Sequence, residues 1–302
     1  MLKKTRITVV ILFILSVVVF SGYRLEQAIS IDRTIPVIEM ESNSITVSVK
    51  GGDEAILEGV TALDGKDGDI TKNLFIESRT TFIEKGRFNV TIAVADRDNH
   101  VTKAEREVIY SDYIPPQFSL TEPFKFLSTK ESRDDLNIAA ALSASDVIDG
   151  NISNRIKMSS EYSIDGSPTG DYTMEFNVTN SMGDTARLPV TITIYSAMEE
   201  SGLPEIILSK YLINTPVGTS VDIKGLVERI KYHNSIYRRA EDGNFYSTEF
   251  DSMGNPLMIS GDSIHVDNNV EWEKPGVYEV KITYTDEATS LSNYIRCYIV
   301  VY

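Results

Sequence analysis

The sequence predicts an all-β chain of three tandem β-sandwich modules that follow an N-terminal transmembrane helix. An uncharged apolar run lies close to the N-terminus, and short runs of alternating β-branched residues, broken by Gly, Asp, Asn and Pro, follow it. One strand pattern recurs three times along the chain. The 302 residues are 42% hydrophobic and 24% charged, close to ordinary globular usage, which excludes long disordered, collagen-like and coiled-coil structures.

The predicted membrane helix is built on residues 7–20, which are uncharged and almost wholly apolar. With its flanks the run reaches about 17 uncharged residues, the short end of what crosses a hydrocarbon core. A cleaved signal peptide is the alternative. The exit at residues 20–23 offers small residues but no A-x-A cleavage pattern, so we favour an uncleaved signal anchor.

The charges that flank this run set the expected topology. Lys3, Lys4 and Arg6 precede it, and no acidic residue does. The positive-inside rule therefore places the N-terminus in the cytoplasm and residues 24–302 outside the cell membrane.

Three copies of one late strand predict three modules. Each copy has a glycine, an aromatic residue two positions on, alternating apolar residues and a final Asp or Asn, and the copies begin at Gly86, Gly170 and Gly276. The glycine suits a turn, the alternation buries one face, and the Asp or Asn can hold the next turn. Residues 62–71 also align without a gap with residues 144–153.

Module boundaries are expected next to prolines, which give short, stiff linkers. Pro36, Pro116 and Pro204 stand at these places. We therefore expect a cytoplasmic stub, span and linker at residues 1–32, and modules at residues 33–112, 113–198 and 199–302.

In this arrangement the chain resembles a bacterial immunoglobulin-like domain family, of the DGxDGDIT type, found in Gram-positive surface proteins and in an insecticidal crystal-protein branch. Residues 64–71 carry the phrase DGKDGDIT and Gly86-x-Phe88 follows it. In the second module Val147 and Ile148 replace Gly and Lys, and in the third the phrase is absent. The resemblance implies immunoglobulin-like β-sandwiches in extracellular arrays, and it implies no reaction.

The acidic phrase raises the hypothesis of a calcium site. Asp64, Asp67 and Asp69, with Asp96 brought near by the late strand, would supply hard oxygen ligands for Ca²⁺. The twelfth residue counted from Asp64 is Phe75, which excludes an EF-hand. The alternative, which we favour, is that Asp and Gly form consecutive turns at a strand end.

The third module differs from the others by an insertion within residues 227–271. Its opening and closing glycine and aspartate stand 24 positions farther apart than in the first module. The insertion concentrates aromatic and basic residues, the types that anchor binding surfaces. We expect partner contacts here; the alternative is an extra hairpin packed on its own module. The candidate contact residues are Tyr232, Tyr237, Arg238, Arg239, Phe245 and Tyr246.

Charge and motifs exclude several classes of function. A net charge of −15 repels nucleic-acid backbones and anionic headgroups. The three histidines are scattered, and no G-x-S-x-G, H-E-x-x-H or phosphate-binding loop occurs, so we expect no enzyme. The single cysteine, Cys297, is expected to be a small buried hydrophobe. An exported β-protein without disulfides favours a Gram-positive bacterial origin.

The sequence thus predicts a membrane-anchored extracellular repeat protein that acts in cell-surface binding or adhesion through its distal module. The alternatives are a structural stalk or assembly element of an envelope complex, and a carbohydrate-contacting accessory protein. The expected partner is a protein or a cell-wall glycan.

Overall fold

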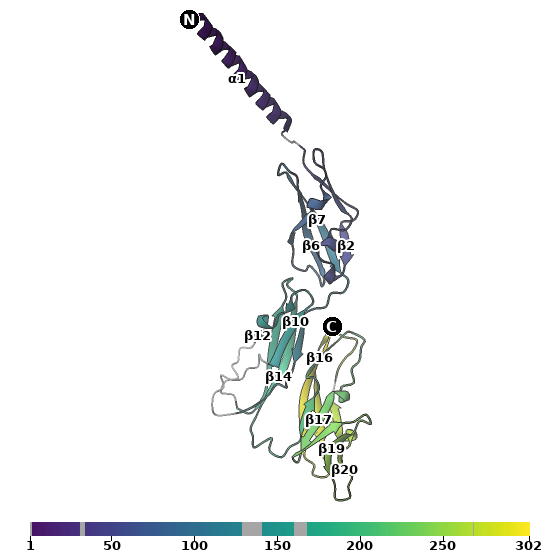
Figure 1. Ribbon diagram of the computed structural model, residues 1–302. Coiled ribbons are helices and arrows are strands. Elements are labelled where there is room, and N and C mark those ends of the chain that lie inside the picture. The colour runs from purple at the N-terminus through teal and green to yellow at the C-terminus, as the bar shows by residue number, and fades with distance from the viewer. Residues whose placement is uncertain (1, 31–33, 129–140, 160–167, 268) are drawn as a thin grey trace. The chain divides into compact units, whose positions relative to one another are not determined.

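The structure is a computed structural model that describes residues 2–30, 34–128, 141–159, 168–267 and 269–302 (Figure 1). The N-terminal helix α1 spans Leu2–Ser30. Within it, Arg6–Glu26 has a mean hydropathy of 2.2 and is long and apolar enough to cross a membrane, although a signal sequence shares these properties. The expected start of the first module, residue 33, lies outside the described residues.

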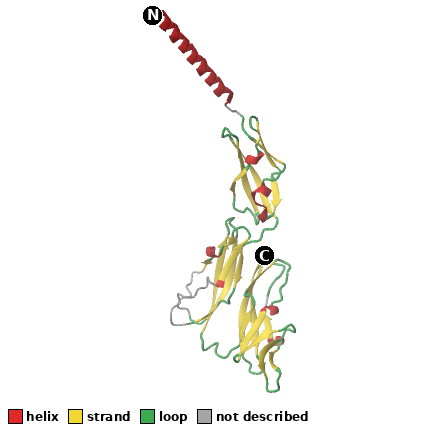
Figure 2. Ribbon diagram, viewed as in Figure 1, coloured by secondary structure: helices red, strands yellow, loops and turns green. Residues whose placement is uncertain are grey.

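The first module is a sandwich of two sheets (Figure 2). Phe88, Val90, Ile92 and Val94 alternate along β6 and are fully buried between the sheets, because successive side chains of a strand point to opposite faces. One sheet is β1 (Val37–Met40), β3 (Val60–Asp64) and β4 (Gly68–Asp69); the other is β2 (Ser44–Val47), β7 (Val101–Tyr110), β6 (Arg87–Ala95) and β5 (Phe75–Arg79).

Short helices interrupt the strands of this module. The alternating run at residues 44–49 leaves the sheet after Val47, because the hydroxyl of Ser48 accepts the N–H of Lys50 and begins a 3₁₀ turn. The buried guanidinium of Arg106 donates to the carbonyls of Ile56, the last residue of α2, and of Glu58, both at 2.7 Å. The helix α2 spans Gly52–Ile56. The 3₁₀ turns among the described residues are Val49–Gly51, Thr71–Asn73, Ser153–Arg155, Lys224–Leu226 and Gly261–Ser263.

The second module repeats this plan. Its late strand β13 buries Met174, Phe176 and Val178, the residues that correspond to the alternating apolar set of β6. One sheet is β11 (Gly150–Asn151), β10 (Leu142–Asp146) and β8 (Gln117–Leu120); the other is β12 (Lys157–Ser159), β13 (Gly170–Thr179), β14 (Thr185–Tyr195) and β9 (Lys125–Leu127).

The third module has the same two layers, but one of its sheets is wider. The insertion supplies strands that extend this sheet to five, where the corresponding sheets of the other modules have three. The wide sheet is β15 (Glu205–Leu208), β17 (Val227–Tyr232), β18 (Ser235–Arg239), β19 (Phe245–Phe250) and β20 (Pro256–Ile259); the other is β16 (Leu212–Thr215), β23 (Ser292–Val301), β22 (Gly276–Thr285) and β21 (Ile264–Asp267).

The chain divides into two compact units, residues 1–113 and residues 114–302, so the second and third modules share one unit. The guanidinium of Arg296 donates to both carboxylate oxygens of Asp171 at 3.1 and 2.5 Å. The hydroxyl of Tyr298 accepts the N–H of Thr191 at 2.9 Å and donates to its carbonyl at 3.1 Å. These polar contacts join β23 of the third module to β13 and β14 of the second. The prediction of separate modules does not anticipate this pairing.

Cys297 is fully buried in this unit, and burial raises the pKa of its thiol to about 12. The prediction that it is a small core hydrophobe is confirmed.

Candidate binding surface

The acidic phrase of the first module folds into a turn that its own carboxylates hold. Asp64 ends β3, and its Oδ1 accepts the backbone N–H groups of Lys66 and Asp67, both at 2.8 Å. Its Oδ2 accepts the hydroxyl of Thr34 at 3.0 Å. The N–H of Asp67 leads these donors in holding the pKa of Asp64 below its ordinary value. Asp67 in turn accepts the N–H of Arg97 at 2.9 Å.

The other predicted calcium ligands are engaged in the same way. Asp69 accepts the N–H of Thr71 at 2.9 Å. Asp96 accepts the N–H of His100 at 2.8 Å, and its other oxygen lies 2.6 Å from Nδ1 of that histidine. Among the described residues, no three acidic, histidine or cysteine side chains gather as a metal site would require. These contacts fit the favoured alternative, in which the aspartates hold consecutive turns.

The second module repeats this use of carboxylates. Asp146 accepts the N–H groups of Ile148 and Asp149 at 2.9 and 3.0 Å, and the side-chain amide of Asn180 at 3.1 Å. Asp149 reaches across to the N–H of Ser181 at 2.7 Å. Both copies of the phrase therefore connect the turn after one strand to the turn after the late strand.

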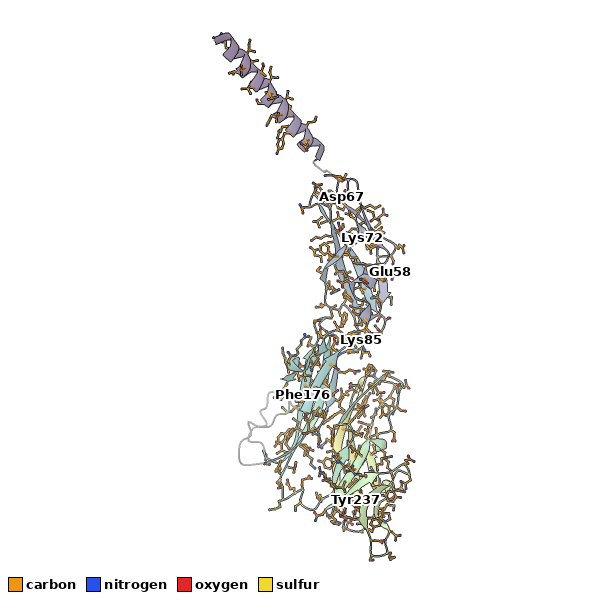
Figure 3. The ribbon with its side chains drawn as sticks, in the orientation of Figure 1. Glu58, Asp67, Lys72, Lys85, Phe176 and Tyr237 are labelled. Atoms are coloured by element: carbon orange, nitrogen blue, oxygen red, sulfur yellow. The ribbon has the colours of Figure 1, made fainter. Side chains whose placement is uncertain are left out.

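Three of the six predicted contact residues of the insertion lie in the core. Tyr232, Tyr237 and Phe245 expose 6%, 8% and 0% of their surface (Figure 3 labels Tyr237). They alternate along β17, β18 and β19 on the face that packs onto the rest of the third module. The expectation that these three contact a partner is wrong, because their rings fill the sandwich.

Of the remaining three residues, Arg239 contacts its own module, whereas Arg238 and Tyr246 are at least partly open to solvent. Arg239 donates to the carbonyl of Lys224 at 2.6 Å, and its guanidinium lies 5.9 Å from the ring centroid of Phe245, so it ties the insertion to its own module. Arg238 is exposed and Tyr246 is half-buried. The strands of the insertion thus have one face buried in the module and one face open to solvent.

The strand register gathers the exposed residues into what we call the outer face. Arg229 of β17 lies opposite Arg238 of β18, which lies opposite Tyr246 of β19. Residues paired across antiparallel strands project from the same side of a sheet. The outer face consists of the row Ile207, Arg229, Arg238, Tyr246 and Met258, and the neighbouring row Glu205, Lys231 and Ile236.

Arg229 and Arg238 are neighbours of like charge without a counter-ion. Among the residues that the structure describes, no carboxylate forms an ion pair with either guanidinium, whereas Lys231 pairs with Glu205 at 3.0 Å. The Nε of Arg229 is buried and has no hydrogen-bond partner. Arg229 lies within the predicted insertion but was not among the predicted contacts; the alternation of β17 is the signal that identifies it.

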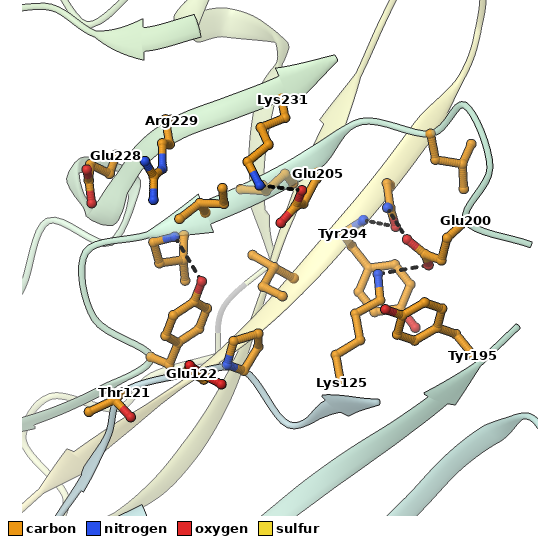
Figure 4. Close-up of a pocket in the computed structure, with 18 residues that line it drawn as sticks. Thr121, Glu122, Lys125, Tyr195, Glu200, Glu205, Glu228, Arg229, Lys231 and Tyr294 are labelled. Carbon is orange, nitrogen blue, oxygen red and sulfur yellow. Dashed lines mark hydrogen bonds and ion pairs between the residues drawn. The ribbon is translucent and has the colours of Figure 1, made fainter. Parts of the chain in front are cut away.

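A cleft of about 620 Å³ adjoins this face, at the junction of the second and third modules (Figure 4). Glu205, Arg229 and Lys231 belong to both the cleft and the outer face. Lys125 of β9 pairs with Glu200 at 2.8 Å on the opposite side. Tyrosines and glutamates supply much of the remaining lining: Tyr195, Tyr211, Tyr294, Glu122 and Glu228.

The charges around this cleft shift the pKa of Tyr211, which lines it. Its hydroxyl accepts the N–H of Leu208 at 3.4 Å. Burial raises its pKa, and the nearby carboxylates of Glu205 and Glu122 raise it further, whereas Arg229 lowers it. The cleft is therefore a mixed electrostatic environment. Lys231 and Lys125 form ion pairs there, whereas Arg229 forms none among the described residues.

Neither a protein-family model nor a curated protein sequence matches this chain. Solved structures similar to it include the M60 catalytic domain with two CBM51 domains from Clostridium perfringens ZmpB, at 10% identity and a TM-score of 0.21 over 90% of this chain and 31% of that one. The extracellular cadherin domains 1–5 of protocadherin gamma B2 match at 12% identity and a TM-score of 0.18, over 90% of this chain and 61% of that one. The lipoprotein BT2262 from Bacteroides thetaiotaomicron matches at 10% identity and a TM-score of 0.19, over 87% of this chain and 99% of that one.

This chain spans about a third of the length of the first of these structures. At such identities and scores, the likenesses carry no argument about what the protein binds.

Proposed function

We propose that the protein is a membrane-anchored, extracellular binding protein without enzymatic activity, and that the outer face of its third module contacts a partner protein. The apolar run of helix α1 and the basic residues in its first turns support an anchor with the sandwiches outside. The repeated turns at Asp64 and Asp146 support membership of the bacterial immunoglobulin-like family that the sequence resembles.

The composition of the outer face is the observation that carries this proposal. Ile236 and Met258 expose 42% and 53% of their surface on the same face as two arginines that form no ion pair within the described part of the chain. Arginine and aromatic residues are enriched where proteins bind one another, and the chain is otherwise strongly acidic. The insertion that creates β19 and β20 also widens this face, which adds contact area.

One observation favours a second candidate, an assembly element of an envelope complex. The second and third modules pack into one unit through Arg296 and Tyr298, which suits a stiff structural part. In that case the contacts of the outer face would be with other copies of the chain or with neighbouring envelope proteins.

Site-specific photo-crosslinking in the cells that make the protein tests the binding proposal. A benzophenone amino acid replaces Tyr246 on the outer face or, as a matched control, the exposed Phe75 of the first module. We expect a discrete protein adduct from position 246 alone. Equal adducts from both positions, or none from position 246, would contradict the proposal, and an adduct between two copies of this chain would support the assembly candidate.

Cysteine labelling tests the topology. Cys297 is buried with a raised pKa, so the natural thiol should not react with a maleimide in the folded protein. We expect the Ser252→Cys variant to react with a membrane-impermeant maleimide on intact cells, and Lys4→Cys to react only after permeabilisation. Labelling of both before permeabilisation would contradict the anchored topology.

A further inference from the structure

The pair Arg229 and Arg238 is destabilising unless something neutralises it. Like charges directly opposite one another in an antiparallel sheet repel, and the two residues are register partners on β17 and β18. The neighbouring cations are already satisfied, since Lys231 pairs with Glu205 and Lys125 with Glu200. In a chain with 44 acidic residues, two adjacent arginines that pair with no carboxylate among the described residues therefore indicate a site for an external anion.

The surroundings of the pair distinguish between kinds of anion. Four glutamates line the adjoining cleft: Glu122, Glu200, Glu205 and Glu228. They would repel a densely charged phosphate polymer more strongly than an isolated carboxylate. The neighbours of the pair in the same row are Ile207, Tyr246 and Met258. A ligand that sets a carboxylate beside apolar groups matches this row, and an acidic protein segment has that chemistry.

The hydrogen bonds already made restrict how such a ligand is held. The hydroxyl of Tyr246 donates to Asp242 at 2.7 Å, so this tyrosine offers its ring and not its hydroxyl. The guanidinium groups supply the free donors, and a guanidinium binds a carboxylate through two parallel N–H groups. The Nε of Arg229 has no partner among the described residues, but it is buried, so a carboxylate reaches it only if the side chain turns outward.

We propose that Arg229 and Arg238 together form a carboxylate-binding site for an acidic segment of the partner protein, with Tyr246 and Met258 packing on the apolar groups beside that carboxylate. This inference rests on the proposed function of the outer face and names the chemistry of its partner.

The test measures binding of a dye-labelled glutamate oligomer, whose glutamates are separated by leucines, to the full chain in lipid nanodiscs by fluorescence anisotropy. Arg238→Gln should weaken binding by about tenfold, because the loss of a hydrogen bond between charged groups lowers an affinity by about this factor. Arg238→Lys should recover only part of the loss, because lysine keeps the charge but not the planar pair of donors. The matched control is Arg187→Gln, which removes an exposed arginine on β14 and should leave the affinity unchanged.

Arg229 gives a second, local measurement. The nitrogen-15 NMR signal of its Nε–H group should shift when the glutamate oligomer is added, and it should not shift with inorganic polyphosphate of equal total charge. Because Arg229 is partly buried, Arg229→Gln is interpreted only if its circular dichroism matches that of the unmodified chain. The exposed Arg238 keeps the test decisive if that variant does not fold.

Three results would overturn the inference: equal losses for Arg238→Gln and Arg187→Gln, tighter binding of polyphosphate than of the glutamate oligomer, or no movement of the Arg229 signal. These failures are distinguishable from failure of the proposed function. A protein adduct confined to position 246, together with glutamate binding that ignores Arg238, would keep the binding surface and reject the carboxylate site.

Discussion

The turn that follows the third strand of the first module differs in kind from its counterpart in the third module. After β3, Asp64 accepts two backbone N–H groups and the chain makes only the two-residue strand β4. At the matching end of β17 stands Tyr232, whose hydroxyl donates to Asp286 at 3.0 Å. The second module follows the first, with Asp146 hydrogen-bonded to Asn180.

This difference shows how one scaffold acquires a surface that the others lack. An aspartate at the strand end draws the following backbone into a tight turn around its carboxylate. A tyrosine fills the core instead, reaches the same late turn through its hydroxyl, and leaves the backbone free to continue. The chain then reverses in a two-residue turn at His233 and Asn234, both with positive φ, and β18 runs back along β17.

Replacing Tyr232 should have the largest effect on the third module. Tyr232→Ala removes a buried ring, and the resulting cavity should lower the free energy of unfolding by about 3–5 kcal/mol. Trp272, the only tryptophan of the chain, is partly buried in this module and reports its unfolding by fluorescence in denaturant. Tyr232→Phe keeps the ring and should lose only about 1 kcal/mol. Equal losses would mean that the hydroxyl, and not the packing, holds the turn.

The corresponding change in the second module should be smaller. Asp146→Ala leaves the N–H groups of Ile148 and Asp149 and the amide of Asn180 without their acceptor, which should lower local stability by about 1–3 kcal/mol. Hydrogen exchange of residues 144–152 in the full chain measures this loss. Exchange that remains as slow as in the unmodified protein would show that the carboxylate does not hold this turn.

A pH titration separates the charged part of the Tyr232 contact from its packing. The hydroxyl of Thr289 chiefly lowers the pKa of Asp286, and the hydroxyl of Tyr232 contributes. A carboxylate with a lowered pKa contributes stability above its unfolded pKa of about 3.9, and this contribution disappears as the pH falls through its folded pKa. The difference in stability between Tyr232→Phe and the unmodified chain should therefore shrink in acid.

Carboxyl NMR shifts provide the direct measurement of that titration. In Tyr232→Phe the pKa of Asp286 should rise towards its ordinary value, because one of its donors is gone. An unchanged pKa would show that the hydrogen bond from Tyr232 does not stabilise the ionised form. Asp64, whose pKa is lowered without any tyrosine donor, is the internal reference that should not move.

The sequence predicts the sandwiches well because period-two burial is local information. Phe88, Val90 and Ile92 alternate in the sequence and are buried in the structure, as are their counterparts around Phe176 and Ile282. The outer face is harder to predict, because the strand register decides which residues of the insertion face outward. That register follows from the turn at His233 and Asn234; recognising it in the sequence would have placed Tyr237 inside and Arg238 outside.

No pattern in the sequence predicts that the second and third modules pack against each other. Tyr298 and Thr191 are 107 positions apart, and each is an ordinary strand residue of its own module. Only the way in which the two sandwiches meet makes a tyrosine hydroxyl the partner of a backbone N–H and carbonyl. The same holds for the cleft, whose lining comes from both modules and from the segment between them.

Of these changes, adding or removing calcium should have the smallest effect on the stability of the protein. In the first module the oxygens of Asp64 and Asp96 accept hydrogen bonds from Lys66, Asp67 and His100, so a cation would have to displace donors that already satisfy them. We expect the midpoint of thermal unfolding of the full chain to be the same with calcium and with a chelator, since a ligand raises it only by binding the folded state. A rise with calcium that Asp64→Asn abolishes would restore the metal site and make the first module, and not the third, the place to look for regulated binding.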